Sequence, residues 1–178
     1  MTKKVSPKAV VDTNVPKTAN LSNSPALISD DLAFCVAECV NAVENIIKKG
    51  GLVMDDGNDI FDEYRKQLSM SGEPGIGDKF LKWVHYHRFG FPPSDRVPIT
   101  KNGDSYDEFP NHEALRDFDM SDRKFVAVAN RHADNPPILE ATDSKWWGWK
   151  EALKESGISV RFLCPDYIRT KYQEKMGK

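Results

Sequence analysis

Two aspartates directly follow apolar stretches that have the length of buried strands. Asp12 follows the run AVV, and Asp143 follows ILEAT. In open parallel sheets, ligands bind outside the carboxyl ends of the strands, so these two carboxylates lie side by side if the strands are neighbours. Each aspartate taken alone is explained equally well as a turn-forming residue at the end of a strand. Together they raise the question of a site at one edge of a sheet.

Two acidic residues on expected helices can add to this group. Glu63 stands three residues after Ile60 and next to Tyr64, which tilts it toward the buried stripe, where an unpaired carboxylate is costly. Asp122 follows Ser121, a predicted N-cap, and taken alone it is explained by its favourable interaction with the helix dipole. Carboxylates gathered from four elements repel one another unless a cation lies among them. Ligation by oxygen alone favours Mg²⁺ or Mn²⁺ over zinc.

The elements that must position these residues alternate between strands and helices. Apolar runs predict strands at 8–12, 51–54, 138–142 and 158–163, and helical spacing predicts helices at 29–47, 58–68, 78–89, 121–131 and 145–156. Residues 16–25 are expected to be a connector. The alternation favours an α/β fold, which we expect to be a three-layer α/β/α arrangement with a mostly parallel central sheet.

Composition and length restrict the class of protein. The chain has 178 residues and a formal net charge of −2, so we expect one domain spanning 1–178 without a strongly cationic surface. The three cysteines Cys35, Cys39 and Cys164 form no CxxC pair, which predicts neither a disulfide framework nor a zinc knuckle and favours a reducing compartment. Cys35 and Cys39 are expected to pack as small apolar residues. No apolar run approaches the ~18–20 residues of a membrane span, and we expect a cytoplasmic protein that does not contact membranes.

Four motifs in order give the chain a resemblance to a known family. AVVDTNV resembles the opening strand motif of the PIN-domain nucleases, DEYRKQL their second motif, SDRKFVAVA their third and ILEATDSKW their fourth. The ending SGISVRFLCPDY is similar to the last strand of the family. The resemblance covers roughly residues 8–168, and the segment 71–118 is longer and more aromatic than a minimal member needs.

The resemblance implies a metal-dependent ribonuclease. It places the catalytic and metal-binding carboxylates at Asp12, Glu63, Asp122 and Asp143, with Asn14 and Thr142 as supporting residues. The implied cofactor is Mg²⁺ or Mn²⁺, and the implied substrate is single-stranded RNA, with DNA not excluded. A toxin held by an antitoxin, an RNA-processing enzyme and a defence nuclease share these residues, so an antitoxin or another protein partner and a homodimer remain open.

Two other functions are weighed against the nuclease. A haloacid-dehalogenase-like phosphatase also begins with a strand-end aspartate, but it needs a second aspartate where this chain has Asn14. A noncatalytic PIN-like module that binds RNA or a protein usually lacks one of the metal-binding carboxylates, and here all four motifs carry theirs.

Further polar and aromatic residues have weaker assignments. Lys82, Trp83 and Arg88 combine cationic and aromatic groups and are candidates for binding a single strand, although an amphipathic helix covering the sheet explains them slightly better. His85 and His87 point apart on a helix and are poorly placed to share a metal. In the Trp-rich segment 146–149, at least one ring is expected in the core. Roles for Asp55, Asp56 and Asp119 stay open.

Overall fold

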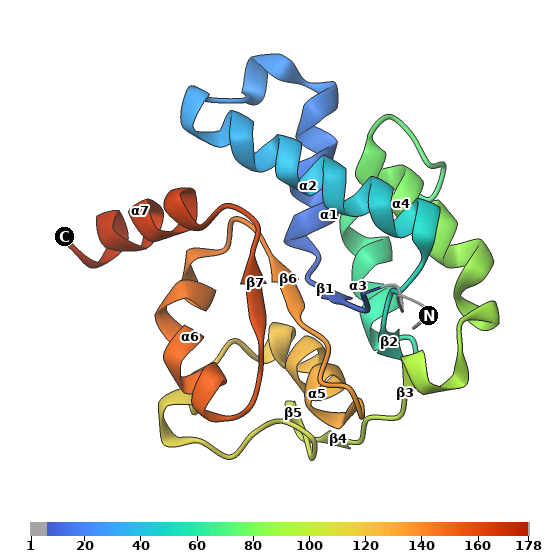
Figure 1. Ribbon diagram of the computed structural model, residues 1–178, viewed down its shortest axis with the longest axis vertical. Helices are drawn as coiled ribbons and strands as arrows, with labels where there is room; N and C mark the ends of the chain where they lie inside the picture. The colour runs from blue at the N-terminus through green and yellow to red at the C-terminus, as the bar shows by residue number, and fades with distance from the viewer. Residues whose placement is uncertain (1–6, 178) are drawn as a thin grey trace, which may run out of the picture.

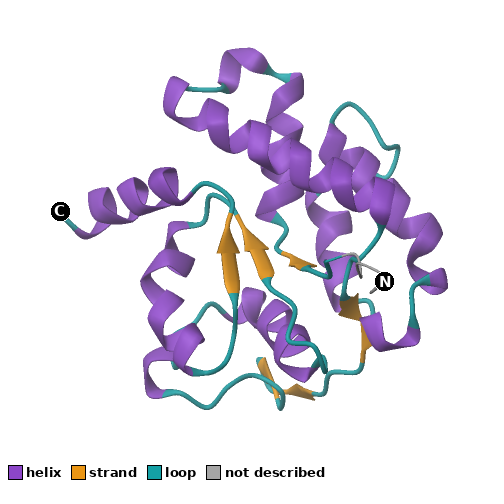
Figure 2. Cartoon of the chain, in the orientation of Figure 1, coloured by secondary structure: helices purple, strands orange, loops and turns teal. Residues whose placement is uncertain are grey.

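The central strand of the fold is β1 (Val10–Val11), whose apolar residues are completely buried. The computed structural model describes residues 7–177. β1 pairs in parallel with β6 (Ile138–Glu140), with Val11 opposite Leu139, and β6 pairs in parallel with β7 (Val160–Phe162). The chain therefore has an α/β fold with a small parallel sheet of order β1-β6-β7 (Figures 1 and 2).

A second pair of parallel strands adjoins the free edge of β1. The amide of Ala9 donates to the carbonyl of Gly51, and the amide of Val53 donates to the carbonyl of Ala9, both at 2.9 Å. The same segment continues into β2 (Met54–Asp55), which pairs in parallel with β3 (Arg96–Val97). The strands thus follow one another across the molecule in the order β3-β2-β1-β6-β7, with β1 in the middle.

Seven α-helices surround these strands in the described part of the chain. They are α1 (Asn14–Ala19), α2 (Asp30–Lys49), α3 (Asp59–Gln67), α4 (Ile76–His87), α5 (Arg123–Arg131), α6 (Ser144–Glu155) and α7 (Pro165–Met176). α5 contacts β1, β2 and β6, α6 contacts β7, and α1, α2 and α4 pack against one another (Figure 1). The helices expected at 29–47, 58–68, 78–89, 121–131 and 145–156 are confirmed, with ends shifted by a few residues.

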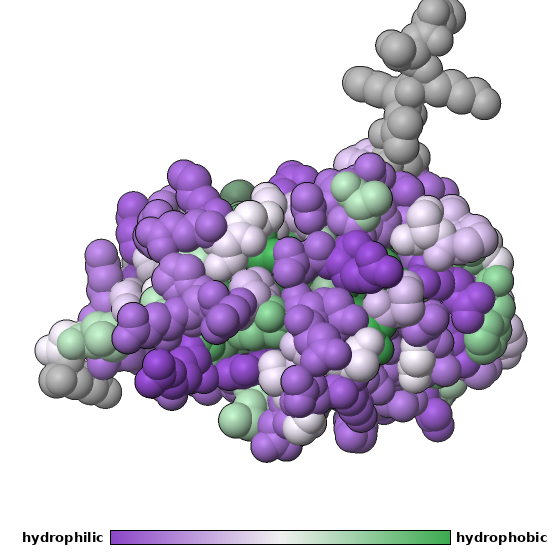
Figure 3. All heavy atoms as spheres, turned by 90° about the horizontal axis from the view of Figure 1, so that it is seen from below, coloured by the Kyte–Doolittle hydropathy of each residue, from purple (hydrophilic) through white to green (hydrophobic). Residues whose placement is uncertain are grey.

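Short single-turn elements and a hairpin complete the fold. The 3₁₀ turns are η1 (Asn20–Asn23), η2 (Pro25–Leu27), η3 (Arg88–Gly90), η4 (Pro93–Asp95), η5 (Glu113–Leu115) and η6 (Met120–Asp122). The strands β4 (Lys101–Asn102) and β5 (Ser105–Tyr106) pair antiparallel. The face in Figure 3 is mainly hydrophilic, with small and separate apolar areas.

Several local predictions are wrong. Residues 16–25 are not a connector, because α1 begins at Asn14 and carries Pro16 in its first turn, where proline does not break a helix. The helix α7 was not predicted. Ser121 does not cap α5, because the side chain of Asp119 instead accepts from the amide of Ser121 at 3.0 Å and caps η6.

The cysteines also depart from the prediction. Cys35 in α2 and Cys164, which precedes α7, form a disulfide with their Cα atoms 5.2 Å apart. The two residues are 129 positions apart, so no local spacing pointed to the pair. Both are buried in the core, as is Cys39, which stays a thiol. The expected burial is correct, and the expectation that the cysteines form no disulfide is wrong.

Candidate metal centre

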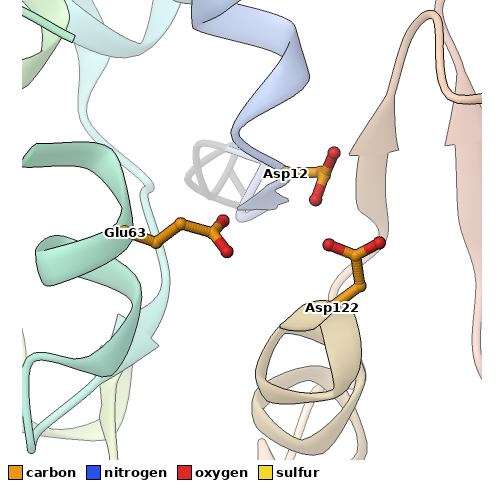
Figure 4. A group of neighbouring side chains, drawn as sticks. All are labelled: Asp12, Glu63 and Asp122. Carbon is orange, nitrogen blue, oxygen red and sulfur yellow. The ribbon is translucent and has the colours of Figure 1, made fainter. Parts of the chain in front are cut away.

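Three of the expected carboxylates meet at the end of β1. Asp12, Glu63 and Asp122 each offer one oxygen, and these oxygens all lie within 4.8 Å of one another. Asp12 is 4% exposed, and the other two are half-buried. Figure 4 shows the three side chains pointing toward one another from the segment after β1, from α3 and from the start of α5.

The backbone after β1 sets the direction of the Asp12 side chain. The amide of Asp12 donates to the carbonyl of Leu139 at 3.1 Å, so the ladder between β1 and β6 extends to this residue. The carbonyl of Asp12 then accepts from the amide of Val15 at 3.0 Å as the chain turns into α1. Asp12 therefore stands at the carboxyl end of a central strand, where parallel sheets present ligand sites.

Asn14 joins the ends of the two neighbouring strands. Its side-chain amide donates to Asp12 and to Glu140, and its Oδ1 accepts from the amides of Ala141 and Thr142, both at 3.1 Å. A side chain that bonds to both strand ends fixes their separation. Asn14 thus orients the Asp12 carboxylate from outside the three-carboxylate group.

Glu63 is held by a hydroxyl and by an ammonium group. Its Oε2 accepts from the hydroxyl of Thr13, and its Oε1 lies 2.8 Å from Nζ of Lys124. The side chain of Lys124 is only 13% exposed, so this ion pair is partly shielded from water. The ammonium group of Lys124 therefore balances the charge of one of the three carboxylates, that of Glu63.

Burial and mutual repulsion make the other two carboxylates hard to ionise. Burial, followed by the charges of Asp12, Asp119, Asp143 and Glu63, raises the pKa of Asp122 to about 8. Burial is also the main cause that raises the pKa of Asp12 to about 7, and hydrogen bonds partly offset it. A divalent cation removes this penalty because it favours the ionised form of each carboxylate.

Asp143 lies outside the group that meets within 4.8 Å. Its Oδ1 accepts from the amide of Lys145 at 3.1 Å and caps α6. Its charge nonetheless contributes to raising the pKa of both Asp12 and Asp122. Asp143 therefore influences the ionisation of the centre through its charge, while its side chain caps α6. Thr142 hydrogen-bonds through its hydroxyl to that of Thr18 at 3.3 Å.

Glu140 is a buried acid at this centre that the sequence analysis missed. It is fully buried in β6, and its Oε1 accepts from the amide of Ala141 at 3.1 Å and from the side chain of Asn14. Its Oε2 is buried without a hydrogen-bond partner in the described residues. Burial, followed by the charge of Asp12, raises the pKa of Glu140 well above its usual range. The signal was present, because a glutamate inside the apolar run ILEAT has no ordinary structural explanation.

Two of the three acidic residues whose roles were open, Asp55 and Asp119, have structural roles. Asp55 is buried and accepts from the amides of Asp59 and Ile60 at 2.7 and 2.9 Å, which fixes the first turn of α3. Asp119 caps η6 and lies 3.5 Å from Nζ of Lys145. Asp56 is exposed.

The candidate nucleic-acid residues have separate surroundings. Nζ of Lys82 lies 3.5 Å from the carbonyl oxygen of Ser71, and the half-buried ring of Trp83 packs between Phe80 and Phe91. The guanidinium of Arg88 lies over an aromatic ring of α3. The ring of His85 stacks on Phe61, and the ring of His87 packs edge-on against Trp83.

The Trp-rich segment contributes mainly to packing. Trp146 is fully buried, which confirms that at least one ring lies in the core. Trp149 is half-buried and lies 4.5 Å from Phe118 between ring centroids, and Trp147 contacts Phe162 at 5.1 Å.

Comparison of the chain with family models, with curated proteins and with solved structures gives no match. Among residues 7–177, no helix combines the length and the apolar character needed to cross a membrane.

Proposed function

We propose that this protein is a metal-dependent nuclease with a three-layer PIN-like fold that hydrolyses phosphodiester bonds of single-stranded RNA. The observation that carries the proposal is the meeting of Asp12, Glu63 and Asp122, from three separate elements, within 4.8 Å. Carboxylates brought together in this way suit a hard divalent cation, Mg²⁺ or Mn²⁺. The strand order, with β1 central and Asp12 at its carboxyl end, supports the same proposal.

The three carboxylates hold the cation in this proposal, and Asp143 lies close enough to add negative charge. A bound divalent cation lowers the pKa of water and neutralises charge on the phosphate. Asn14 keeps Asp12 in one orientation through the bonds between the ends of β1 and β6. Lys124 is a second positive group beside Glu63, within reach of a phosphate that approaches the carboxylates.

A noncatalytic RNA-binding or protein-binding module is the second candidate, and the ion pair between Lys124 and Glu63 favours it. In that function, the lysine neutralises the glutamate permanently and no metal enters. The phosphatase is less well supported. Asn14 uses its amide to bond Asp12 and Glu140, so it supplies no carboxylic acid to a leaving group.

The proposed chemistry is compatible with several biological roles of nucleases. A toxin restrained by an antitoxin, an RNA-processing enzyme and a defence nuclease all need this centre. The proposal extends to a possible homodimer and to a cytoplasmic location, where a disulfide such as that between Cys35 and Cys164 is rare. RNA is proposed over DNA because of the resemblance of the four motifs to PIN-domain nucleases.

Cleavage in the presence and absence of metal tests the proposal. The purified chain is incubated with single-stranded RNA and with single-stranded DNA, in Mn²⁺, in Mg²⁺ and in EDTA. We expect cleavage that EDTA abolishes, and a loss of at least about 100-fold in Asp12→Asn and Asp122→Asn, since these variants remove a metal ligand. Asp56→Asn is the matched control, because Asp56 is exposed and lies outside the group.

The outcomes separate the candidates. Binding of RNA without cleavage in any metal supports the noncatalytic module. Full activity in Asp12→Asn or Asp122→Asn, with circular dichroism showing an intact fold, rejects the nuclease.

A further inference from the structure

Arginine and phenylalanine side chains alternate along a surface formed by α3, η3 and β3. The guanidinium carbon of Arg88 lies 4.0 Å from the ring centroid of Phe61 and 4.3 Å from that of Phe89. The guanidinium of Arg65 lies 5.9 Å from the Phe61 ring, and that of Arg96 lies 5.2 Å from the Phe89 ring. We name this group of five residues the arginine–phenylalanine surface; Phe61, which is 3% exposed, forms its buried base.

The positive charge of this surface is not neutralised by ion pairs. Within residues 7–177, none of the salt bridges includes Arg65, Arg88 or Arg96, so no carboxylate oxygen lies within 4.0 Å of their nitrogens. Burial and the like charges of Arg65 and Arg96 lower the pKa of Arg88, while the charge of Asp62 acts in the opposite direction. Three guanidinium groups that repel one another favour an anionic ligand.

The central arginine is held in place by neutral groups. Nε of Arg88 donates to Oδ1 of Asn58 at 3.2 Å, and its Nη1 donates to the carbonyl of His85 at 2.8 Å. These bonds fix the guanidinium without cancelling its charge. A fixed planar cation loses little freedom when it binds a phosphate, so the surface is organised before a ligand arrives.

An exposed aromatic ring accompanies the charges. Phe89 is 64% exposed although it is a large apolar residue, and the guanidinium groups of Arg88 and Arg96 lie near its ring. Alternating cationic and aromatic groups suit single-stranded nucleic acids, because arginines contact phosphates and a ring stacks on a base of any identity. An acidic protein segment uses only the charges and gains nothing from the exposed ring.

The helix α3 places this surface beside the candidate metal centre. Glu63 and Arg65 are two residues apart on α3, so their side chains leave the helix about 200° apart. Glu63 and Arg65 therefore lie on opposite flanks of α3, so the near edge of the arginine–phenylalanine surface lies roughly one helix diameter, about 10–12 Å, from Glu63. A strand that crosses the solvent side of α3 reaches both.

We propose that the arginine–phenylalanine surface binds a single-stranded nucleic acid, with phosphates on Arg65, Arg88 and Arg96 and a base stacked on Phe89. This inference rests on the proposed function in one respect, namely that the bound strand continues across α3 to the carboxylates. Binding itself needs neither metal nor cleavage, which allows the two proposals to fail separately.

Binding of a fluorescein-labelled oligouridylate in EDTA, followed by fluorescence anisotropy over a series of salt concentrations, tests the inference. The charge variant is Arg65→Gln with Arg96→Gln, and its control is Lys48→Gln with Lys154→Gln, which removes the same charge from exposed residues of α2 and α6. We expect weaker binding for the charge variant only. The slope of log affinity against log salt falls by about 0.7 for each lost phosphate contact with a single strand.

A second pair of variants tests the stacked base. Phe89→Ala is expected to weaken oligouridylate binding by about tenfold, and Phe89→Leu, which keeps the apolar volume, is expected to weaken it nearly as much. Three results overturn the inference: no binding by the unmodified chain at low salt, equal losses in the charge variant and its lysine control, or equal affinity for poly-glutamate. Binding without cleavage in Mn²⁺ leaves the inference standing and rejects the nuclease.

Discussion

The hydroxyl of Tyr64 donates a hydrogen bond to the carbonyl oxygen of Val11, 2.6 Å away and completely buried. Tyr64 follows Glu63, and Val11 precedes Asp12. This one bond therefore joins the backbone of the central strand to the helix that carries the second carboxylate. The geometry of the candidate metal centre depends on a contact in the core.

Tyr64→Phe removes that bond without changing the shape of the core. We expect the free energy of unfolding in urea to fall by about 1–3 kcal/mol, because a buried carbonyl loses its partner. We also expect weaker Mn²⁺ binding by calorimetry, since α3 is no longer tied to β1. Tyr106→Phe is the control, because its hydroxyl bonds to Asp59 at 2.8 Å on a half-buried surface. An unchanged Mn²⁺ affinity in Tyr64→Phe rejects this role for the bond.

The metal-free protein is expected to lose stability as the pH rises. The folded-state pKa of Asp12 is about 7 and that of Asp122 about 8, whereas an unperturbed aspartate has a pKa of 3.8. Between these values the unfolded chain has released protons that the folded chain still holds, so stability falls with rising pH and levels off above the folded-state values. Thermal melting in EDTA from pH 5 to pH 9 measures this, and a melting temperature that increases across the range contradicts it.

Added Mn²⁺ should reverse that trend. Metal ligands must be deprotonated, so Mn²⁺ binds more tightly as Asp12 and Asp122 ionise. Ligand present at about 100 times its dissociation constant stabilises by ~2.7 kcal/mol, and we expect a larger rise in melting temperature at pH 8.5 than at pH 6. Asp122→Asn is expected to remove most of the rise. A rise of equal size at both pH values indicates binding elsewhere on the chain.

Glu140→Gln should separate the effect of the ionisable group of Glu140 from the effect of its volume and hydrogen bonds. Because the pKa of Glu140 is raised far above its usual range, the protonated acid is the form that fits the folded state, and glutamine resembles that form. We expect Glu140→Gln to keep the fold and to be more stable than the parent above neutral pH, with little difference near pH 4. Glu140→Ala leaves a cavity and removes the partner of Asn14, and we expect it to lose 2 kcal/mol or more, on the order of other buried truncations. Greater destabilisation by glutamine than by alanine contradicts this assignment.

Lys124 and a metal ion should compete for Glu63. Two unit charges 4 Å apart interact by about 1 kcal/mol in water and by more in a partly buried site, so we expect Lys124→Met to bind Mn²⁺ at least about fivefold more tightly. If the lysine also contacts the phosphate, the same variant cleaves more slowly despite its tighter metal binding. Lys145→Met is the control, because Lys145 pairs with Asp119 at 3.5 Å outside the group. Equal Mn²⁺ affinity in both variants shows that Lys124 does not occupy the centre.

The parts of the site that were predictable are those with a local signal. A carboxylate directly after an apolar run marks a strand end, and this located Asp12 and Asp143 at neighbouring strands. The half-buried position of Glu63 agrees with the expectation from helical spacing. Which carboxylates meet was not predictable. An aspartate at the position of Asp143 can bind a metal or cap a helix, and the choice depends on where α6 begins. Glu140 was missed because the run ILEAT was interpreted from its apolar residues as a buried strand, and the glutamate within it was not considered separately.

The disulfide between Cys35 and Cys164 had no local signal at all, since 129 residues separate its ends. It closes a large loop between α2 and the start of α7, and cross-links of this kind stabilise by about 2–4 kcal/mol, chiefly by restricting the unfolded chain. We expect dithiothreitol to lower the midpoint of urea unfolding in the parent chain and to leave Cys35→Ser with Cys164→Ser unchanged. Thiol titration of the unfolded, non-reduced protein should then find one reactive group, Cys39. Three reactive thiols, with no effect of the reductant on stability, would mean that the protein holds these cysteines reduced, as the sequence alone led us to expect.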